Sequence, residues 1–158
     1  MKIEELAPRL VSRGHSVTVY CRSNNIQWTQ PYYKGVRLVI LPTISHKYLD
    51  TVVHTALSVL HGVFRDYDIV LVCNAANSLF CIIPRLRGQK VVLNADGIER
   101  NRKKWNVFGR AWYKLGEHLA TRLPNLLISD ARVIQDYYRE RYNANSTMIP
   151  YGATPEMV

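Results

Sequence analysis

The sequence predicts an α/β domain with an open, mainly parallel sheet, and three observations support this fold class. Along the chain, apolar residues recur alternately with the period of a helix and with that of a strand. Residues 69–73 are apolar throughout, as in a strand covered on both faces. The chain has 158 residues, 47% of them hydrophobic, which suits one domain with a proper core. Strands that alternate with helices favour a parallel sheet with flanking helices.

The first half of the chain contains a helix, two strands and a second helix. The pattern predicts a helix over residues 3–13, because Gly14 is a typical helix stop. Strands follow at 17–21 and 36–41, with a polar loop at 22–34 between them. A helix over 48–65 has an apolar stripe and a polar face. The stripe comprises Val53, Leu57, Leu60 and Phe64, and the polar face comprises Asp50, His54, Ser58, His61 and Arg65.

The second half repeats a strand–helix unit. The predicted strands are residues 69–73, 90–93, 126–129 and 147–149, and the predicted helices are 78–86, 109–123 and 131–142. Residues 95–108 are expected to form a charged loop. The domain therefore extends over residues 1–149, and residues 150–158 begin a linker.

The predicted order of elements starts with a helix, whereas open α/β domains of this kind usually start with a strand. If a central strand is missing between the strands at 17–21 and 69–73, these two strands either expose unpaired backbone or pair with each other. Exposed sheet edges favour association.

The net charge indicates which classes of ligand the chain could bind, and the cysteine content indicates its cellular compartment. The net charge is +9, and residues 99–122 hold seven cations and two acids. Such an excess attracts nucleic acid, phosphorylated ligands or an anionic membrane surface. Cys21, Cys73 and Cys81 have no zinc-site spacing and are interpreted as small buried residues, which favours the cytoplasm. No apolar run is long enough to span a membrane.

Candidate binding residues follow the carboxyl ends of the predicted strands, where parallel sheets bind ligands. These candidates are His46, Lys47, Asn74, Asn77, Asp96, Gly97, Ser129 and Asp130. Each pair also has a purely structural interpretation: His46 and Lys47 form a loop before a helix, and Asn74 and Asn77 start a helix. Asp96 and Gly97 form a turn, and Ser129 and Asp130 cap a helix. Gly97 would let backbone approach a ligand closely. His54 and His61 are interpreted as surface residues.

A basic cluster follows directly, comprising Arg100, Arg102, Lys103 and Lys104. These cations suit a phosphorylated acceptor or an anionic lipid surface, with four nearby aromatic residues at the interface: Trp105, Phe108, Trp112 and Tyr113. The alternative is a solvated basic loop and a helix whose aromatic residues pack inward.

The first predicted helix ends in Arg-Gly-His (13–15) before a strand, and three further motifs are distinctive: His-Lys-Tyr-Leu-Asp-Thr (46–51), Asn-Ala-Asp-Gly-Ile-Glu (94–99) and Ile-Pro-Tyr-Gly-Ala (149–153). In these motifs the chain resembles the amino-terminal domain of family-4 glycosyltransferases of the two-domain GT-B type, in a bacterial rhamnosyltransferase-like subgroup. The resemblance implies a Rossmann-like domain, one half of a GT-B fold.

The resemblance implies transfer of a sugar, with retention, from a nucleoside-diphosphate-sugar to a glycan or a polyprenyl-phosphate-linked acceptor. The nucleotide-sugar is a co-substrate, and no other cofactor or metal is expected. Asp96 is the implied catalytic residue, and Tyr151-Gly152 is the implied hinge. The implied substrate-binding residues are His46, Lys47, Asn74, Gly97, Glu99, Arg100, Lys103 and Lys104.

Two features of that family are absent from this sequence: the first strand with its glycine-rich loop, and the donor-binding domain with its paired glutamates. The resemblance therefore predicts little or no activity for residues 1–158 alone. A second hypothesis is a non-catalytic basic module that binds anionic membrane or nucleic acid. Nucleic acid is disfavoured because no helix-turn-helix or RNA-binding aromatic motif is present. A third hypothesis is a gene fragment without function. The expected location is cytoplasmic, on the inner face of the membrane if peripheral.

Overall fold

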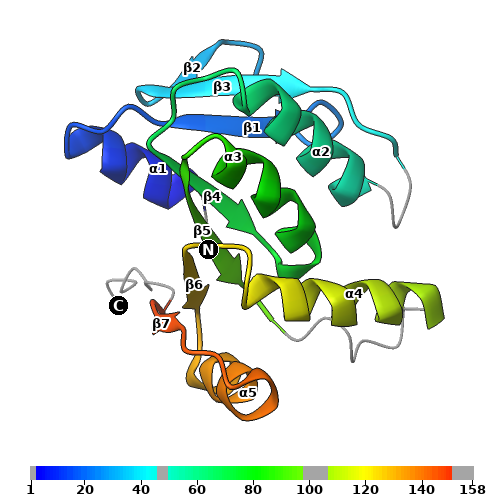
Figure 1. Cartoon of the computed structure of the whole chain (residues 1–158). Helices are drawn as coiled ribbons and strands as arrows, with labels where there is room; N and C mark the ends of the chain where they lie inside the picture. The colour runs from blue at the N-terminus through cyan, green and yellow to red at the C-terminus, as the bar shows by residue number, and fades with distance from the viewer. Residues whose placement is uncertain (1–2, 46–49, 98–106, 151–158) are drawn as a thin grey trace, which may run out of the picture. The chain divides into compact units, whose positions relative to one another are not determined.

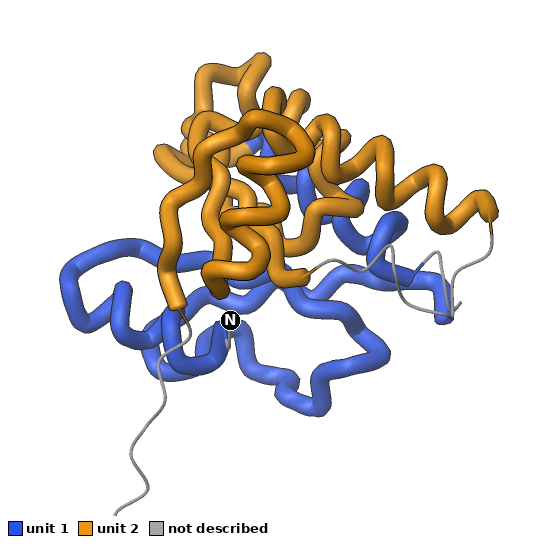
Figure 2. The backbone as a smooth tube through the Cα atoms, turned by 90° about the horizontal axis from the view of Figure 1, so that it is seen from below, with its two compact units in different colours: residues 1–64 blue, residues 65–158 orange. Residues whose placement is uncertain are grey.

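The computed structural model describes residues 3–45, 50–97 and 107–150 (Figure 1). The chain divides into two compact units, residues 1–64 and 65–158 (Figure 2). Each unit has its own sheet, so each is described by itself. The expectation of one domain over residues 1–149 stays a prediction.

Unit 1 is a three-stranded sheet with two helices. Its elements are α1 (Ile3–Ser12), β1 (Thr18–Arg22), β2 (Tyr32–Tyr33), β3 (Val36–Leu41) and α2 (Asp50–Gly62). The strand order is β1-β3-β2, with β1 parallel and β2 antiparallel to β3. Both predicted helices and both predicted strands are present, with shifts of one to a few residues at their ends.

The short strand β2 lies in the segment that the sequence predicts as loop. Lys34 and Gly35 connect it to β3 with φ angles of 47° and 78°. Two consecutive residues with positive φ form the two-residue hairpin turn that matches the twist of a strand pair. A Cβ on Gly35 would also lie 2.8 Å from Cγ1 of Val11 in α1, so this turn requires glycine for space as well as for conformation.

The packed face of α2 differs from the predicted one. His54 is buried and hydrogen-bonds to the backbone of Cys21, and Nδ1 of His61 lies 3.0 Å from the Tyr20 hydroxyl. Phe64, in the predicted apolar stripe, is exposed. The prediction that His54 is a surface residue is therefore wrong, whereas His61, predicted to be a surface residue as well, is half-buried. Polar partners on β1 allow imidazole groups to pack on the sheet, which apolar periodicity does not reveal.

Unit 2 is a four-stranded, all-parallel sheet with helices between successive strands. Its elements are β4 (Ile69–Cys73), the 3₁₀ helix η1 (Ala75–Cys81), α3 (Ile82–Leu86), β5 (Lys90–Ala95), α4 (Val107–Ala120), β6 (Leu126–Ser129), α5 (Arg132–Tyr142) and β7 (Thr147–Met148). The strand order is β4-β5-β6-β7. The predicted fold class, a Rossmann-like α/β sheet flanked by helices, is confirmed.

The core of unit 2 lies between this sheet and its helices. Val91, Leu93 and Ala95 alternate along β5 and are fully buried, together with Ala120 of α4 and Tyr138 of α5. Because β4 to β7 follow one another across the sheet, right-handed connections place α3, α4 and α5 on the same face. The predicted helix over 78–86 is present, but it begins earlier and as a 3₁₀ helix.

Both units have an open sheet edge. Among the described strands, β1 pairs only with β3 and β4 pairs only with β5. Ile69 and Leu71 of β4 are exposed, so this strand is not covered on both faces as its apolar sequence predicts. Each of the two strands expected to flank a missing one is therefore an edge strand in the sheet of its own unit.

Candidate functional site

The carboxyl ends of β4 and β5 lie side by side, and three of the predicted site residues follow them: Asn74, Asp96 and Gly97. Cys73 is opposite Asn94 in the register, and the Asn74 amide donates to the Asn94 carbonyl over 3.0 Å. Asn74 follows β4 directly, and Asp96 and Gly97 follow β5. The register thus brings these three residues to the edge where parallel sheets bind ligands.

Asn74 has the least favourable backbone conformation at this edge, with φ 76° and ψ 129°. A side chain with Cβ rarely adopts such angles, at a cost of about 1–3 kcal/mol. Its Oδ1 accepts a hydrogen bond from the Ala76 amide over 2.9 Å and caps η1. Among the described residues, its Nδ2 has no hydrogen-bond partner. Asn74 is therefore both a helix start and a source of a free amide donor.

Asn77 has a structural role. It is buried, and its Nδ2 donates to the Cys73 carbonyl over 2.9 Å. This bond satisfies the last carbonyl of β4 and holds η1 against the end of the strand. Its Oδ1 is buried and has no partner within the described part of the chain.

Asp96 and Gly97 follow β5 at this edge, where Asp96 is exposed and Gly97 is half-buried. The Asp96 side chain is exposed, and Gly97 has a φ of 139°. No described atom lies within 4 Å of a Cβ built on Gly97, so this backbone is open to an approaching group. Burial raises the pKa of the Cys73 thiol, and the Asp96 carboxylate raises it further. Both effects favour the protonated thiol over the thiolate, which is the nucleophilic form of cysteine.

Ser129 and Asp130, at the end of β6, do not cap the following helix. The N-cap residue of α5 is Ala131, which makes no side-chain capping bond. The Oγ of Ser129 is instead 2.7 Å from the Oγ of Ser146, which precedes β7. The predicted capping role is wrong, because Ala131 occupies the N-cap position and the Ser129 hydroxyl is hydrogen-bonded to Ser146.

The site depends on residues that the sequence analysis did not assign to it. Nε1 of Trp112 donates to the Ala76 carbonyl over 3.1 Å, and the Ser78 hydroxyl donates to the Gly116 carbonyl over 2.8 Å. A Cβ on Gly116 would lie 2.6 Å from the Ala75 carbonyl oxygen. This close contact fixes η1, and hence Asn74, against α4. A glycine inside a predicted helix is the one sequence signal that could have indicated it.

The remaining predicted site residues lie outside the described residues. They are His46, Lys47, Glu99, Arg100, Lys103, Lys104, Tyr151 and Gly152, and Trp105 of the interface aromatics lies there too. Within the described ranges, no group of three or more His, Cys, Asp or Glu side chains is arranged to hold a metal ion. Nor does any described helix have the length and apolarity to cross a membrane.

Comparison with known proteins identifies one family. A family model described as a domain of unknown function, DUF1972, matches residues 69–154, more than half of the chain. The match spans all of β4 to β7 and therefore the whole candidate site. This domain is found in glycosyltransferase-associated proteins. No curated protein matches the chain.

Proposed function

The chain belongs to the DUF1972 family, and from this premise we propose that it is the acceptor-side part of a glycosyltransferase. The carboxyl ends of β4 and β5 bind hydroxyl groups of a sugar acceptor. The donor is a nucleoside-diphosphate-sugar, and the acceptor is a glycan or a polyprenyl-phosphate-linked sugar. The all-parallel sheet and the association of this family with glycosyltransferases support the proposal.

The main support for the proposal is that Asn74 adopts an energetically unfavourable backbone conformation at the edge of the sheet where ligands bind. Local strain of this kind concentrates at functional sites. Nδ2 of Asn74 is a free donor, and Asp96 on the neighbouring strand is an exposed acceptor. A sugar hydroxyl both donates and accepts, so a donor and a carboxylate on adjacent strands suit a vicinal pair of hydroxyls.

In the proposed reaction, the acceptor hydroxyl oxygen bonds to the anomeric carbon while the bond from that carbon to the diphosphate breaks. Asp96 accepts a hydrogen bond from the attacking hydroxyl and orients it, and the departing diphosphate finally takes the proton. The cations Arg100, Lys103 and Lys104 are proposed to neutralise the negative charge of the substrate phosphate groups. Orientation and charge stabilisation can supply most of such a rate enhancement.

The test is an NMR titration of the purified chain with a panel of methyl glycosides, which measures sugar binding. The expected result is that the amide signals of Asn74, Asp96 and Gly97 shift on titration. Asn74→Asp retains the capping acceptor but removes the free amide donor, and it should weaken binding, as should Asp96→Asn. The control is Asp68→Asn, an exposed carboxyl group at the amino end of β4. Shifts that cluster around Asp68, or equal affinity in all variants, would contradict the proposal.

A further inference from the structure

The outward face of α4 exposes large apolar side chains. Val107 is 79% exposed, Phe108 84% and Leu115 48%. Isolated apolar residues are ordinary on a surface, but several on one helix face indicate an interaction surface. At 100° per residue, these three positions share the side of the helix that is turned away from its packed residues.

The orientation of α4 is fixed by its inward face. Tyr113 and Gly116 are buried, and Trp112 donates to η1. Glu117 accepts hydrogen bonds from the hydroxyls of Tyr137 and Tyr142 in α5, over 2.8 Å and 2.7 Å. Two of the aromatic residues expected at an interface, Trp112 and Tyr113, therefore pack inward, whereas Phe108 does not. The helix cannot rotate to bury its apolar outward residues without breaking these contacts.

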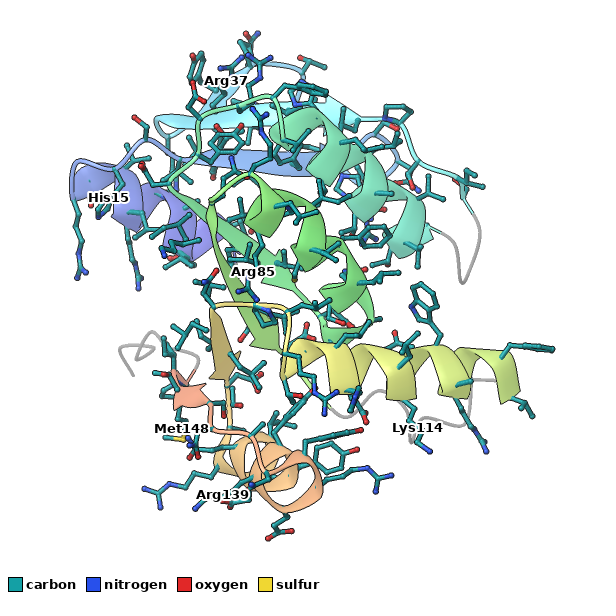
Figure 3. The ribbon with its side chains drawn as sticks, in the orientation of Figure 1. His15, Arg37, Arg85, Lys114, Arg139 and Met148 are labelled. Carbon is teal, nitrogen blue, oxygen red and sulfur yellow. The ribbon has the colours of Figure 1, made fainter. Side chains whose placement is uncertain are left out.

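The charges on this outward face all have one sign. Arg110 and Lys114 are exposed, and the only acid of α4, Glu117, is 2% exposed. Figure 3 shows Lys114 projecting from α4 on the side away from α3. In contrast, α5 has an exposed surface of mixed sign, which includes an ion pair between Arg139 and Asp136.

The end of α3 has a similar combination of exposed side chains. Nη1 of Arg85 donates to the Leu123 carbonyl over 2.6 Å, which places the end of α3 beside the residues that follow α4 (Figure 3). Leu86 is exposed between the exposed cations Arg85 and Arg87. Apolar side chains interspersed with cations and free of exposed acids thus occur on both helices.

We propose that the α4 face, defined as Val107, Phe108, Arg110, Lys114 and Leu115, binds the surface of an anionic lipid membrane. The apolar side chains insert among the lipid chains near the headgroups, and the cations meet lipid phosphates. Nucleic acid fits this face less well, because Tyr113 is buried and the half-buried Trp112 is held by its bond to η1, which leaves Phe108 as the one exposed aromatic ring of α4 that could stack on bases. The inference is independent of the proposed sugar site at the strand ends.

The experiment is vesicle co-sedimentation of the purified chain. Vesicles of phosphatidylglycerol mixed with phosphatidylcholine are compared with vesicles of phosphatidylcholine alone, at low and high salt. Binding to the mixed vesicles only, weakened by salt, is expected. Near an anionic surface each cation contributes about fivefold in affinity, so Arg110→Gln with Lys114→Gln should lower it about 25-fold. Phe108→Ala removes a ring that would be buried in the membrane and should lower the affinity about tenfold.

A matched control lies on α5, where Arg132 and Val133 are a neighbouring exposed cation and exposed apolar residue. Arg132→Gln with Val133→Ala should leave affinity unchanged. All substituted side chains are exposed, and circular dichroism melts establish that each variant is folded. The proposal is overturned if folded chain does not bind the anionic vesicles, or if the control variant loses as much affinity as the α4 variants. Binding to generic duplex DNA that exceeds vesicle binding, with the same sensitivity to the α4 variants, would assign the face to nucleic acid instead.

Discussion

Substitution of Gly116 by alanine is expected to destabilise unit 2 and to displace the helix that holds the candidate site. The added Cβ would lie 2.6 Å from the Ala75 carbonyl oxygen and 3.0 Å from Cα of Ala76. Both are backbone atoms, so no side chain can rotate away. Either α4 or η1 must move, and η1 begins at the cap provided by Asn74.

One stabilising and two destabilising effects determine the change in the free energy of unfolding. Alanine stabilises a helix interior relative to glycine by about 1 kcal/mol. Overpacking of a tight contact costs about 1–3 kcal/mol. Displacement also weakens the bonds from Ser78 to the Gly116 carbonyl and from Trp112 to the Ala76 carbonyl, each worth about 1 kcal/mol. The expected net loss in the free energy of unfolding is about 2 kcal/mol.

The measurement is urea denaturation followed by circular dichroism, together with hydrogen exchange of the η1 amides. Ala111→Gly is the control, because Ala111 is exposed on the same helix and reports helix propensity alone. It should cost about 1 kcal/mol and leave exchange in η1 unchanged. If Gly116→Ala is as stable as the wild type or more stable, the close contact between α4 and η1 does not exist and the reasoning fails.

Three further predictions concern individual side chains. Asn74→Ala should cost about 2 kcal/mol in urea denaturation, because it loses the bond to the Ala76 amide and keeps a Cβ at positive φ; Asn74→Gly should cost about 1 kcal/mol less, and the reverse order would contradict the strain. Tyr142→Phe should cost about 1.5–3 kcal/mol in urea denaturation, because it removes a hydroxyl donor from the buried Glu117 carboxylate; an unchanged midpoint would exclude this bond. Burial lowers the pKa of His54 below 6.5, so the unfolded chain takes up the proton first. The free energy of unfolding should therefore decrease as the pH is lowered from about 7, through 6.5, toward the folded-state pKa. Over that range, the His54→Leu variant should lose less stability than the wild type.

Strand and helix positions could be read largely from the sequence. The strands at 36–41, 69–73 and 126–129 have the predicted bounds, since each is a mainly apolar run bounded by polar, proline or glycine residues. The helix at 131–142 is also present to within one residue. Such segments are determined by local pattern, and the alternation of strands with helices then predicts the parallel sheet.

The candidate site was only partly predictable. Asn74, Asp96 and Gly97 were predicted from their places after strands, because a parallel sheet brings those places to one edge. The contacts of Trp112, Ser78 and Gly116 that hold η1 in place connect residues about 40 positions apart in the chain. No local pattern indicates which helix will lie against η1, so these roles could not be assigned from the sequence.

By itself, the sequence determined the fold class, the order of the elements and the excess of positive charge, because each follows from local periodicity or from composition. Only the tertiary structure decided which face of each helix packs, that β1 and β4 are edge strands, and that Asn74 adopts a strained conformation. It also decided that Trp112 points inward while Phe108 points outward. These outcomes depend on contacts between segments distant in sequence, where a polar partner such as Tyr20 beside His61 can override the apolar pattern.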